Sequence, residues 1–185
     1  MFSGRLWELF IDSFPKILIP GLTVTIPLTV ISFTFALIIA VIMALVQFAN
    51  VKVLKQIARF YIWIFRGTPL LVQLFLVYYG LAQFDAVRQG PLWPYLRDPF
   101  WCAIITMTLH TAAYIAEILR GAIQAIPPGE IEAARALGMS KPKTLFYIIL
   151  PRASRIGLPA YSNEVILMLK ASSLASTVTL LELTG

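Results

Sequence analysis

Long apolar runs separated by short polar segments set the pattern of this chain. Between Lys16 and Lys52 there is no charged residue, whereas a helix needs only about 20 apolar residues to cross the hydrocarbon core of a membrane. The run predicts a first membrane-spanning helix at about 21–48. A cleaved signal peptide is the alternative, but Glu8 and Asp12 precede the run, its length is too great, and no small-residue cleavage site ends it.

Two later apolar runs predict the second and third spans. The second is expected at about 64–84, because no charged residue follows Arg66 within it. The third is expected at about 99–126 and includes Glu117 and Arg120. Their i, i+3 spacing allows these two charged side chains to pair on one helix face.

A fourth span is expected at about 158–181, although it carries Asn163, Glu164 and Lys170 and is the least apolar of the set. No regular series of short alternating segments indicates a barrel, so the backbone must satisfy its hydrogen bonds within helices. The sequence predicts an all-α integral membrane bundle, with residues 1–185 forming a single transmembrane domain.

Composition agrees with this class of protein. Hydrophobic residues make up 59% of the chain and charged residues 13%, against roughly 25% charged residues in a soluble domain. The net charge of +6 would suit a nucleic-acid binder, but the basic residues lie between the apolar runs, as they do when they orient a membrane protein. The single cysteine, Cys102, has no partner for an intrachain disulfide or a metal cluster, and we expect it to be packed as an apolar residue.

Basic residues also predict the orientation of the chain. The segments 52–66 and 127–157 carry an excess of lysine and arginine, whereas the N-terminal tail and the 85–98 loop each balance two bases with two acids. Because cytoplasmic loops are enriched in lysine and arginine, both basic segments are expected in the cytoplasm and the N-terminus outside it.

The cytoplasmic segment 127–157 contains signals for two short helices. Pro128 suits a first helical turn, Gly138 can adopt the left-handed conformation that ends a helix, and Ser140 can cap the next helix, which Pro151 is expected to interrupt. A plain connection between two spans is the alternative interpretation of such a loop. The first helix should expose small alanine side chains to a partner: Ala133, Ala134 and Ala136.

This segment resembles the EAA loop of permease subunits of ATP-binding-cassette (ABC) importers. The spacing E-A-A-x3-G-x9-I-x-L-P is met in full by Glu132, Ala133, Ala134, Gly138, Ile148, Leu150 and Pro151. Three further segments resemble the polar amino-acid permeases of the histidine, lysine, arginine, ornithine and opine type. They are TAAYIAEILRGAI from Thr111, YSNEVILMLK from Tyr161, and the VQLFLVYYG stretch with the residues that precede it, Arg66, Gly67, Thr68, Pro69 and Leu70. His110 stands where that family usually has an asparagine.

The resemblance implies a type I ABC-importer bundle with a fifth span beyond Gly185, in the bacterial cytoplasmic membrane, with a periplasmic N-terminus. It also implies partners: a second permease that is identical or homologous, two ATP-binding subunits, and a periplasmic or extracellular solute-binding protein. The chain has no GxxxxGK[ST] loop, so ATP and Mg²⁺ are expected in the partner ATPase. We expect no cofactor, metal site or catalytic residue in this chain, and no binding of nucleic acid.

Ionisable residues inside the membrane are candidates for the substrate path. Glu117 and Glu164 are expected at similar depth, where they could face one acidic cavity that attracts a cationic amino-acid side chain. A structural pair with Arg120 is the favoured alternative for Glu117, and a structural role for Glu164 is as plausible as substrate contact. A packed, hydrogen-bonded histidine is the favoured alternative for His110. The remaining candidates are Thr111, Tyr161 and Asn163.

Other functions are less consistent with the sequence. A secondary carrier would show internal repeats, and a membrane-embedded hydrolase would need a nucleophile and a base, yet there is one histidine and neither HExxH nor GxSxG. A channel, or an ABC permease for another small solute, remains the alternative. The transported amino acid or opine, and the identity of the second permease, are not determined by these residues.

A cysteine placed at Ser140 tests the predicted orientation. Because the 127–157 segment is basic, this cysteine should not react with a membrane-impermeant thiol reagent in intact cells, and it should react after lysis. The parent chain, with Cys102 alone, measures background labelling. Labelling of the Ser140→Cys chain from outside would show that the orientation is the reverse of the predicted one.

Overall fold

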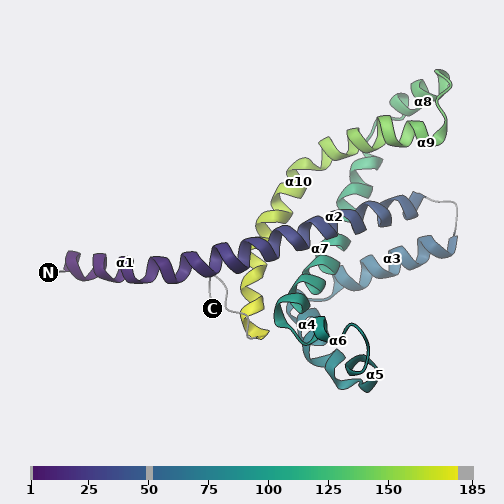
Figure 1. Ribbon diagram of the computed structural model, residues 1–185. Coiled ribbons are helices and arrows are strands. Elements are labelled where there is room, and N and C mark those ends of the chain that lie inside the picture. The colour runs from purple at the N-terminus through teal and green to yellow at the C-terminus, as the bar shows by residue number, and fades with distance from the viewer. Residues whose placement is uncertain (1, 49–51, 179–185) are drawn as a thin grey trace.

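The computed structural model describes residues 2–48 and 52–178, and all regular structure in these ranges is helical (Figure 1). The predicted all-α class is therefore confirmed. The chain begins with a long, nearly continuous helix made of α1 (Phe2–Pro20), the π-helical turn η1 (Gly21–Thr25) and α2 (Ile26–Phe48). The wide turn lies just before Pro27, which has no N–H to donate to the preceding turn.

The second predicted span, 64–84, is not one straight helix. Helix α3 (Lys52–Gly67) and the segment 70–83, which comprises α4 (Leu70–Phe75), η2 (Leu76–Gly80) and η3 (Leu81–Gln83), meet at a bend of 106°. The physical cause lies in Thr68 and Pro69. A residue before proline is disfavoured in the α conformation, and Pro69 adopts an extended ψ of 139° and starts the next helix.

Helix α7 (Pro99–Gln124) is the centre of the bundle. It follows the short helices α5 (Asp85–Arg88) and α6 (Trp93–Leu96), and the Asp98 carboxylate caps it by accepting a hydrogen bond of 2.8 Å from the backbone N–H of Phe100. Helices α2, α3, α4 and α10 all pack against α7.

The segment after α7 turns back sharply at Gly138, between α8 (Pro128–Ala136) and α9 (Lys141–Thr144). Helix α9 is followed by the π-helical turn η4 (Leu145–Ile149), α10 (Leu150–Ala171) and the 3₁₀ helix η5 (Ser172–Val178). Pro151 was expected to interrupt this helix, and that expectation is wrong. Pro151 has no N–H to donate to the preceding turn. The helix widens into a π-helical turn that ends at Ile149, and it continues through the proline.

Two helices in the described ranges are long and apolar enough to cross a membrane, Ile11–Gln47 and Pro99–Gln124, and the bent α3–α4 pair makes a third if it is one span. These correspond to the first three predicted spans. In the fourth, 158–181, the described part is the end of α10 together with η5, and 179–181 lie outside the described residues. Helix α10 is not apolar enough to be counted with them, which agrees with the polar residues that it carries.

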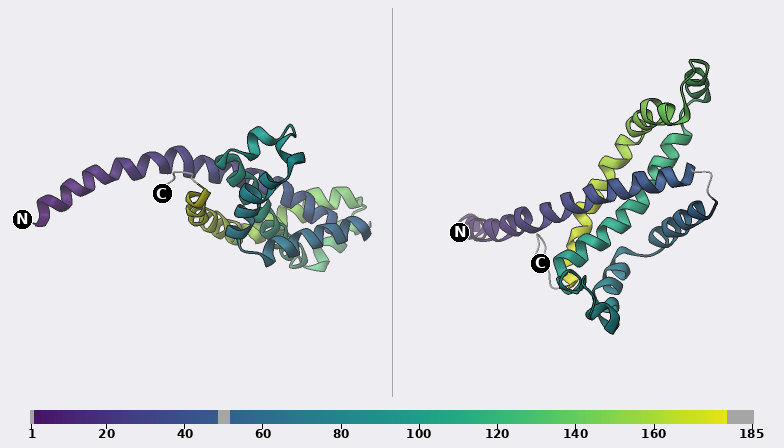
Figure 2. Two further views of the ribbon diagram at one scale, coloured as in Figure 1. Left: turned by 90° about the horizontal axis from the view of Figure 1, so that it is seen from below. Right: turned by 45° about the vertical axis from the view of Figure 1, so that its right-hand side comes forward.

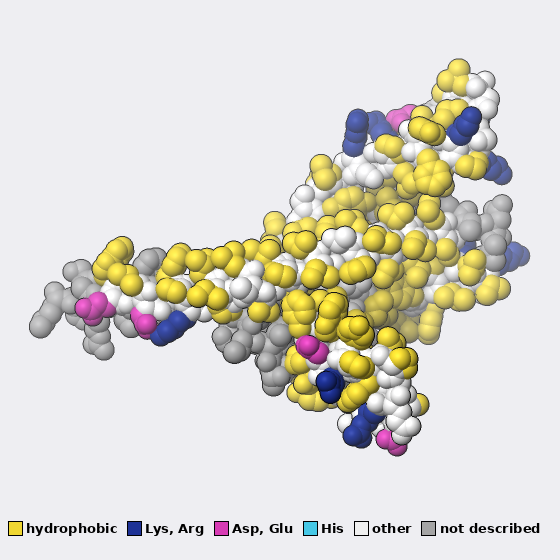
Figure 3. Space-filling view, viewed as in Figure 1, with side chains coloured by type: hydrophobic (Ala, Val, Ile, Leu, Met, Phe, Trp, Pro, Cys, Tyr) yellow, Lys and Arg dark blue, Asp and Glu magenta, His cyan; other side chains and the backbone are white. Residues whose placement is uncertain are grey.

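The ends of several helices lie together. In Figures 1 and 2, the end of α2, the start of α3 and the α8–α9 turn lie at one end of the bundle, away from α1 and from the α5–α6 segment. Lysine and arginine side chains gather around α8 and α9, and hydrophobic side chains cover the exposed length of α2 (Figure 3). This arrangement matches the charge distribution from which the orientation was predicted.

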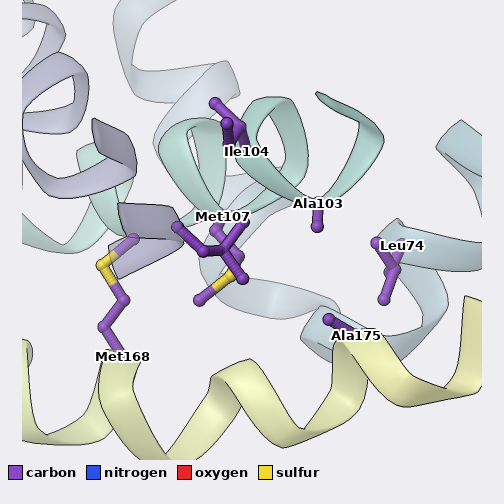
Figure 4. Close-up of a cluster of buried hydrophobic side chains, with 7 residues drawn as sticks. Leu74, Ala103, Ile104, Met107, Met168 and Ala175 are labelled. Carbon is purple, nitrogen blue, oxygen red and sulfur yellow. The ribbon is translucent and has the colours of Figure 1, made fainter. Parts of the chain in front are cut away.

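Small residues hold α2 and α7 in close contact. The buried cluster between α2, α3 and α7 consists of Ala36, Ala40, Ile62, Ala112, Ala113, Ile115 and Ala116. Alanines on facing helices allow the two backbones to approach closely, which is the usual source of packing energy between helices in lipid. A second cluster joins α2, α4, α7, α10 and η5 and consists of Leu28, Leu74, Ala103, Ile104, Met107, Met168 and Ala175. In Figure 4, Met168 points from α10 toward α7.

Replacing Ala40 with leucine tests this packing. Ala40 is fully buried, so the larger side chain should force α2 and α7 apart and lower stability by about 1–3 kcal/mol. The measurement is thermal unfolding of the purified protein in detergent. Val30→Phe adds volume at a position that is 57% exposed and should leave stability unchanged. Equal effects of both substitutions would contradict close packing at Ala40.

Candidate functional site

Two neighbouring cavities share Tyr114, which lines both of them. The larger, of about 560 Å³, lies between α2, α3 and α7, and we name it the arginine cavity. Its lining residues are Gln47, Arg59, Ile62, Trp63, Arg66, Gly67, Tyr114, Glu117 and Arg120. The charged groups among them are three arginines and one glutamate, so the cavity is basic rather than acidic.

Glu117 is paired within the arginine cavity. Arg120 Nε donates to Glu117 Oε2 at 2.9 Å, Arg120 Nη2 donates to Glu117 Oε1, and Arg66 Nη1 lies 3.8 Å from Oε1. The predicted i, i+3 pair on one helix face is therefore present. Two guanidinium groups compensate this carboxylate, so it does not offer a free negative charge to a cation.

The smaller cavity, of about 150 Å³, lies between α4, α7 and α10, and we name it the Glu164 cavity. It is lined by Leu70, Met107, His110, Thr111, Tyr114, Glu164, Leu167, Met168 and Ala171. Glu164 is only 8% exposed, and among the described residues no hydrogen bond or ion pair within 4.0 Å reaches its carboxylate. The Arg66 guanidinium attracts this carboxylate from a longer distance. A buried carboxylate without a direct hydrogen-bond or ion-pair partner is energetically costly and is a candidate for ligand binding.

The expectation that Glu117 and Glu164 share one acidic cavity is wrong. Glu117 lines the arginine cavity and Glu164 lines the other, and Tyr114 lines both. Depth along a helix, which was inferred from residue counts, does not fix the direction in which a side chain points.

The other predicted path residues differ in position. His110 and Thr111 line the Glu164 cavity. Tyr161 does not line it and packs instead against the α2–α7 cluster and Gly157. Asn163 is exposed and lines neither cavity.

The residues at the break between α3 and α4 take part in several interactions. The Arg66 guanidinium lies over the Tyr114 ring at 5.3 Å from its centroid, and Gly67 lines the arginine cavity. Thr68 Oγ1 donates to the carbonyl oxygen of Ile64 at 2.8 Å. Pro69 begins α4.

Sequence reasoning missed Gln73, which is buried between this break and the Glu164 cavity. Its Nε2 lies 2.9 Å from the Phe65 carbonyl oxygen, and its Oε1 lies 3.0 Å from His110 Nδ1. The available signal was a glutamine in an apolar run four residues after a helix-breaking proline. Such a side chain can satisfy backbone groups that the proline leaves without partners.

The turn between α8 and α9 has the predicted geometry. Gly138 has a φ of 74°, and the N–H groups of Gly138 and Met139 donate to the carbonyls of Arg135 and Ala134, at 2.9 and 3.1 Å. This is the Schellman pattern, which requires a left-handed residue at the position after the cap. The predicted glycine turn is confirmed.

The surface of α8 differs from the prediction at one alanine. Glu132, Ala133 and Ala136 are exposed, but Ala134 is only 4% exposed, because α8 folds back on α9 and η4. Further along the motif, Leu150 is half-buried and Pro151 is exposed. Glu130 Oε1 lies 3.3 Å from Arg152 Nη2 and ties α8 to the start of α10.

Large apolar side chains are also exposed at this end of the molecule. Leu137 is 83% exposed, Tyr147 is 74% exposed, and Phe146, which precedes Tyr147, is 59% exposed. Exposed apolar side chains grouped near a polar segment are typical of a surface that binds another protein.

Comparisons with known proteins agree with these features. The profile of the family described as "Binding-protein-dependent transport system inner membrane component" matches residues 36–184. The chain is 48% identical to the octopine transport system permease protein OccM of Rhizobium radiobacter, over 97% of this chain and 71% of that protein. It is 38% identical to the arginine ABC transporter permease protein ArtM of Haemophilus influenzae, over 92% of this chain and 74% of that protein.

Solved structures give the same fold. The crystal structure of an amino acid ABC transporter with histidines matches with a TM-score of 0.83 and 36% identity, over 96% of this chain and 78% of that one. An inward-facing structure of the MetNI methionine ABC transporter matches with a TM-score of 0.70 at 23% identity, over 88% of this chain and 74% of that one, and this likeness concerns the fold alone.

Proposed function

Since this chain belongs to the family of binding-protein-dependent transport system inner membrane components, we propose that it carries a basic amino acid or an opine across the cytoplasmic membrane. The chain is a permease subunit of an ABC importer, and in this family the ATPase is a separate subunit. The family also implies a solute-binding protein as a partner. A second permease, identical or homologous, and two ATPase subunits complete the proposed assembly.

The unpaired carboxylate of Glu164 supports the proposed substrate. A guanidinium or ammonium group entering the Glu164 cavity would give this buried charge a partner, whereas a neutral side chain would not. Relatives named for octopine and arginine transport carry cargo with a guanidinium group. Thr111 and His110, which line the same cavity, supply polar contacts.

The arginine cavity supports a complementary role for the other end of the substrate. Every amino acid carries a carboxylate, and Arg59, Arg66 and Arg120 outnumber the single Glu117 in that cavity. Tyr114 lines both this basic cavity and the Glu164 cavity. A zwitterionic substrate with a cationic side chain would therefore find charge complementarity in the two neighbouring cavities.

The α8–α9 turn supports coupling to the ATPase. This turn exposes Glu132, Ala133 and Ala136 together with the apolar Leu137, on a backbone fixed by the Schellman hydrogen bonds at Gly138. The Glu130–Arg152 ion pair connects the turn to α10, which carries Glu164. A movement of the docked turn can therefore reach the substrate cavity through one continuous helix.

The charge distribution supports the proposed orientation. The basic α8–α9 turn and the start of α3 lie at one end of the bundle (Figure 3). The positive-inside rule places this end in the cytoplasm, where the ATPase would bind it, and places the N-terminus in the periplasm.

Glu164→Gln tests the substrate proposal, because it keeps the shape of the side chain and removes its charge. In the reconstituted complex, the concentration of a cationic substrate that gives half-maximal ATPase stimulation should rise roughly tenfold or more. Stimulation by a neutral amino acid, where it occurs, should change less. The matched control is Asn163→Ala, at an exposed neighbour that lines neither cavity.

Two results would count against the role of Glu164. Loss of the assembled complex, seen by size-exclusion chromatography, would make Glu164 a structural residue. An equal change for cationic and neutral substrates would show that its charge does not select the cargo.

Gly138→Ala tests the coupling turn. A Cβ at Gly138 would meet no atom within 4 Å, and the same is true at Gly129, but among the glycines of the described ranges only Gly138 has a positive φ. Alanine at Gly138 should strain the turn by about 1–2 kcal/mol and weaken ATPase binding by roughly tenfold. Binding is measured by titrating the ATPase onto the permease in lipid nanodiscs.

The control for this experiment is Gly129→Ala, which should bind the ATPase like the unaltered chain. Unchanged ATPase binding and transport by the Gly138→Ala protein would contradict a coupling role for the left-handed turn.

A further inference from the structure

The break between α3 and α4 leaves a backbone carbonyl without its usual partner. In a continuous helix the Phe65 carbonyl would accept a hydrogen bond from the N–H of residue 69, but residue 69 is a proline and has none. The side chain of Gln73 supplies the missing donor, with its Nε2 2.9 Å from the Phe65 oxygen. Gln73 thus replaces one backbone hydrogen bond in a part of the chain that lies among apolar helices.

The same hydrogen bonds determine which way the Gln73 amide faces. Nε2 also lies 3.0 Å from the Thr68 carbonyl oxygen and 2.7 Å from Thr68 Oγ1. Backbone carbonyl oxygens only accept hydrogen bonds, so the atom that faces them must be the NH₂ group. The amide oxygen, Oε1, must therefore point the other way, where His110 Nδ1 lies 3.0 Å from it.

This orientation in turn determines the proton on His110. An amide oxygen has no hydrogen to donate, so His110 Nδ1 must carry the proton of this hydrogen bond. In a neutral imidazole the other ring nitrogen, Nε2, is then a hydrogen-bond acceptor. His110 lines the Glu164 cavity, and among the described residues no protein group donates to its Nε2.

We propose that Gln73 is a positioning residue that holds His110 as the Nδ1–H tautomer, so that His110 Nε2 and the Glu164 carboxylate present two acceptors to one substrate cation. This inference rests on the proposed function and adds a second recognition group to it. The favoured ligand is a cation with several N–H donors, such as a guanidinium or a primary ammonium. Gln73 itself does not line the cavity, and its effect on the substrate passes through His110.

Asparagine at position 110 would preserve this arrangement, and leucine would not. The amide NH₂ group of asparagine can donate to Gln73 Oε1 while its oxygen remains an acceptor for the cavity. Leucine offers neither. His110→Asn and His110→Leu therefore form a matched pair that separates hydrogen bonding from the filling of space.

The tautomer is measured directly by nitrogen NMR. The chain contains one histidine, so a permease labelled with ¹⁵N-histidine and assembled with unlabelled partners gives the signals of His110 alone. At about pH 8, where a free imidazole is neutral, the unaltered protein should show a protonated Nδ1 and an unprotonated Nε2. A protonated Nε2 in the unaltered protein would overturn the proposal without any substitution.

Gln73→Leu removes the amide oxygen that accepts the hydrogen bond from His110 Nδ1. In the assembled complex, this substitution should abolish the preference for the Nδ1–H tautomer and raise the half-stimulating concentration of a cationic substrate roughly tenfold. His110→Leu should have a similar effect, and His110→Asn should retain more of the affinity than His110→Leu. Gln73→Leu combined with His110→Leu should be no worse than the more severe single variant. An unchanged tautomer in Gln73→Leu, or effects that add in the double variant, would contradict positioning through His110.

These results are distinguishable from failure of the proposed function. If Glu164→Gln has no effect on cationic substrates while the Nδ1–H tautomer depends on Gln73, the positioning is correct and the recognition of a cation at Glu164 is wrong. If Glu164→Gln has its expected effect while the tautomer does not depend on Gln73, the substrate proposal stands and the role of Gln73 is wrong.

Discussion

The hydrogen bond that Pro69 cannot make governs the architecture around the substrate cavity. In a membrane interior no water is available to satisfy a backbone carbonyl, so a helix can break there only if the protein provides a substitute donor. The Gln73 amide provides it for Phe65. The chain can then turn by 106° between α3 and α4, which brings Leu70 and Leu74 of α4 against α7 and α10. The Glu164 cavity depends on that turn for one of its walls.

The same constraint explains the wide turns before Pro27 and Pro151. In both places the helix accommodates a proline by forming one π-helical turn instead of ending. Breaking the helix would expose several carbonyls, whereas a wide turn loses less hydrogen bonding. A wide turn thus accompanies Pro27 and Pro151, where the helix continues, and a side-chain amide accompanies Pro69, where the chain changes direction, whereas Pro159 lies inside α10.

The sequence predicts the parts of this molecule that depend on local pattern. The apolar runs of α2 and α7 are long enough to identify by hydropathy, the i, i+3 spacing identifies the Glu117–Arg120 pair, and Gly138 is the residue expected at a left-handed turn. Features that depend on packing between helices were not predictable. Burial of Ala134 results from α8 folding back on the following segment. The placing of Glu117 and Glu164 in different cavities depends on how α3, α4 and α10 pack against α7.

The apolar helix Ile11–Gln47 has 37 residues, so at about 1.5 Å per residue it is roughly 55 Å long. The hydrocarbon core of a bilayer is only about 30 Å thick, and a tilt of about 20°, which is usual for membrane helices, shortens the projected length by less than a tenth. Tilting alone cannot bring this helix within the core. Several turns must extend beyond it, and the charged Asp12 and Lys16, which pair at 2.7 Å, mark the end that does so. The helix therefore continues from lipid into the aqueous boundary without a loop.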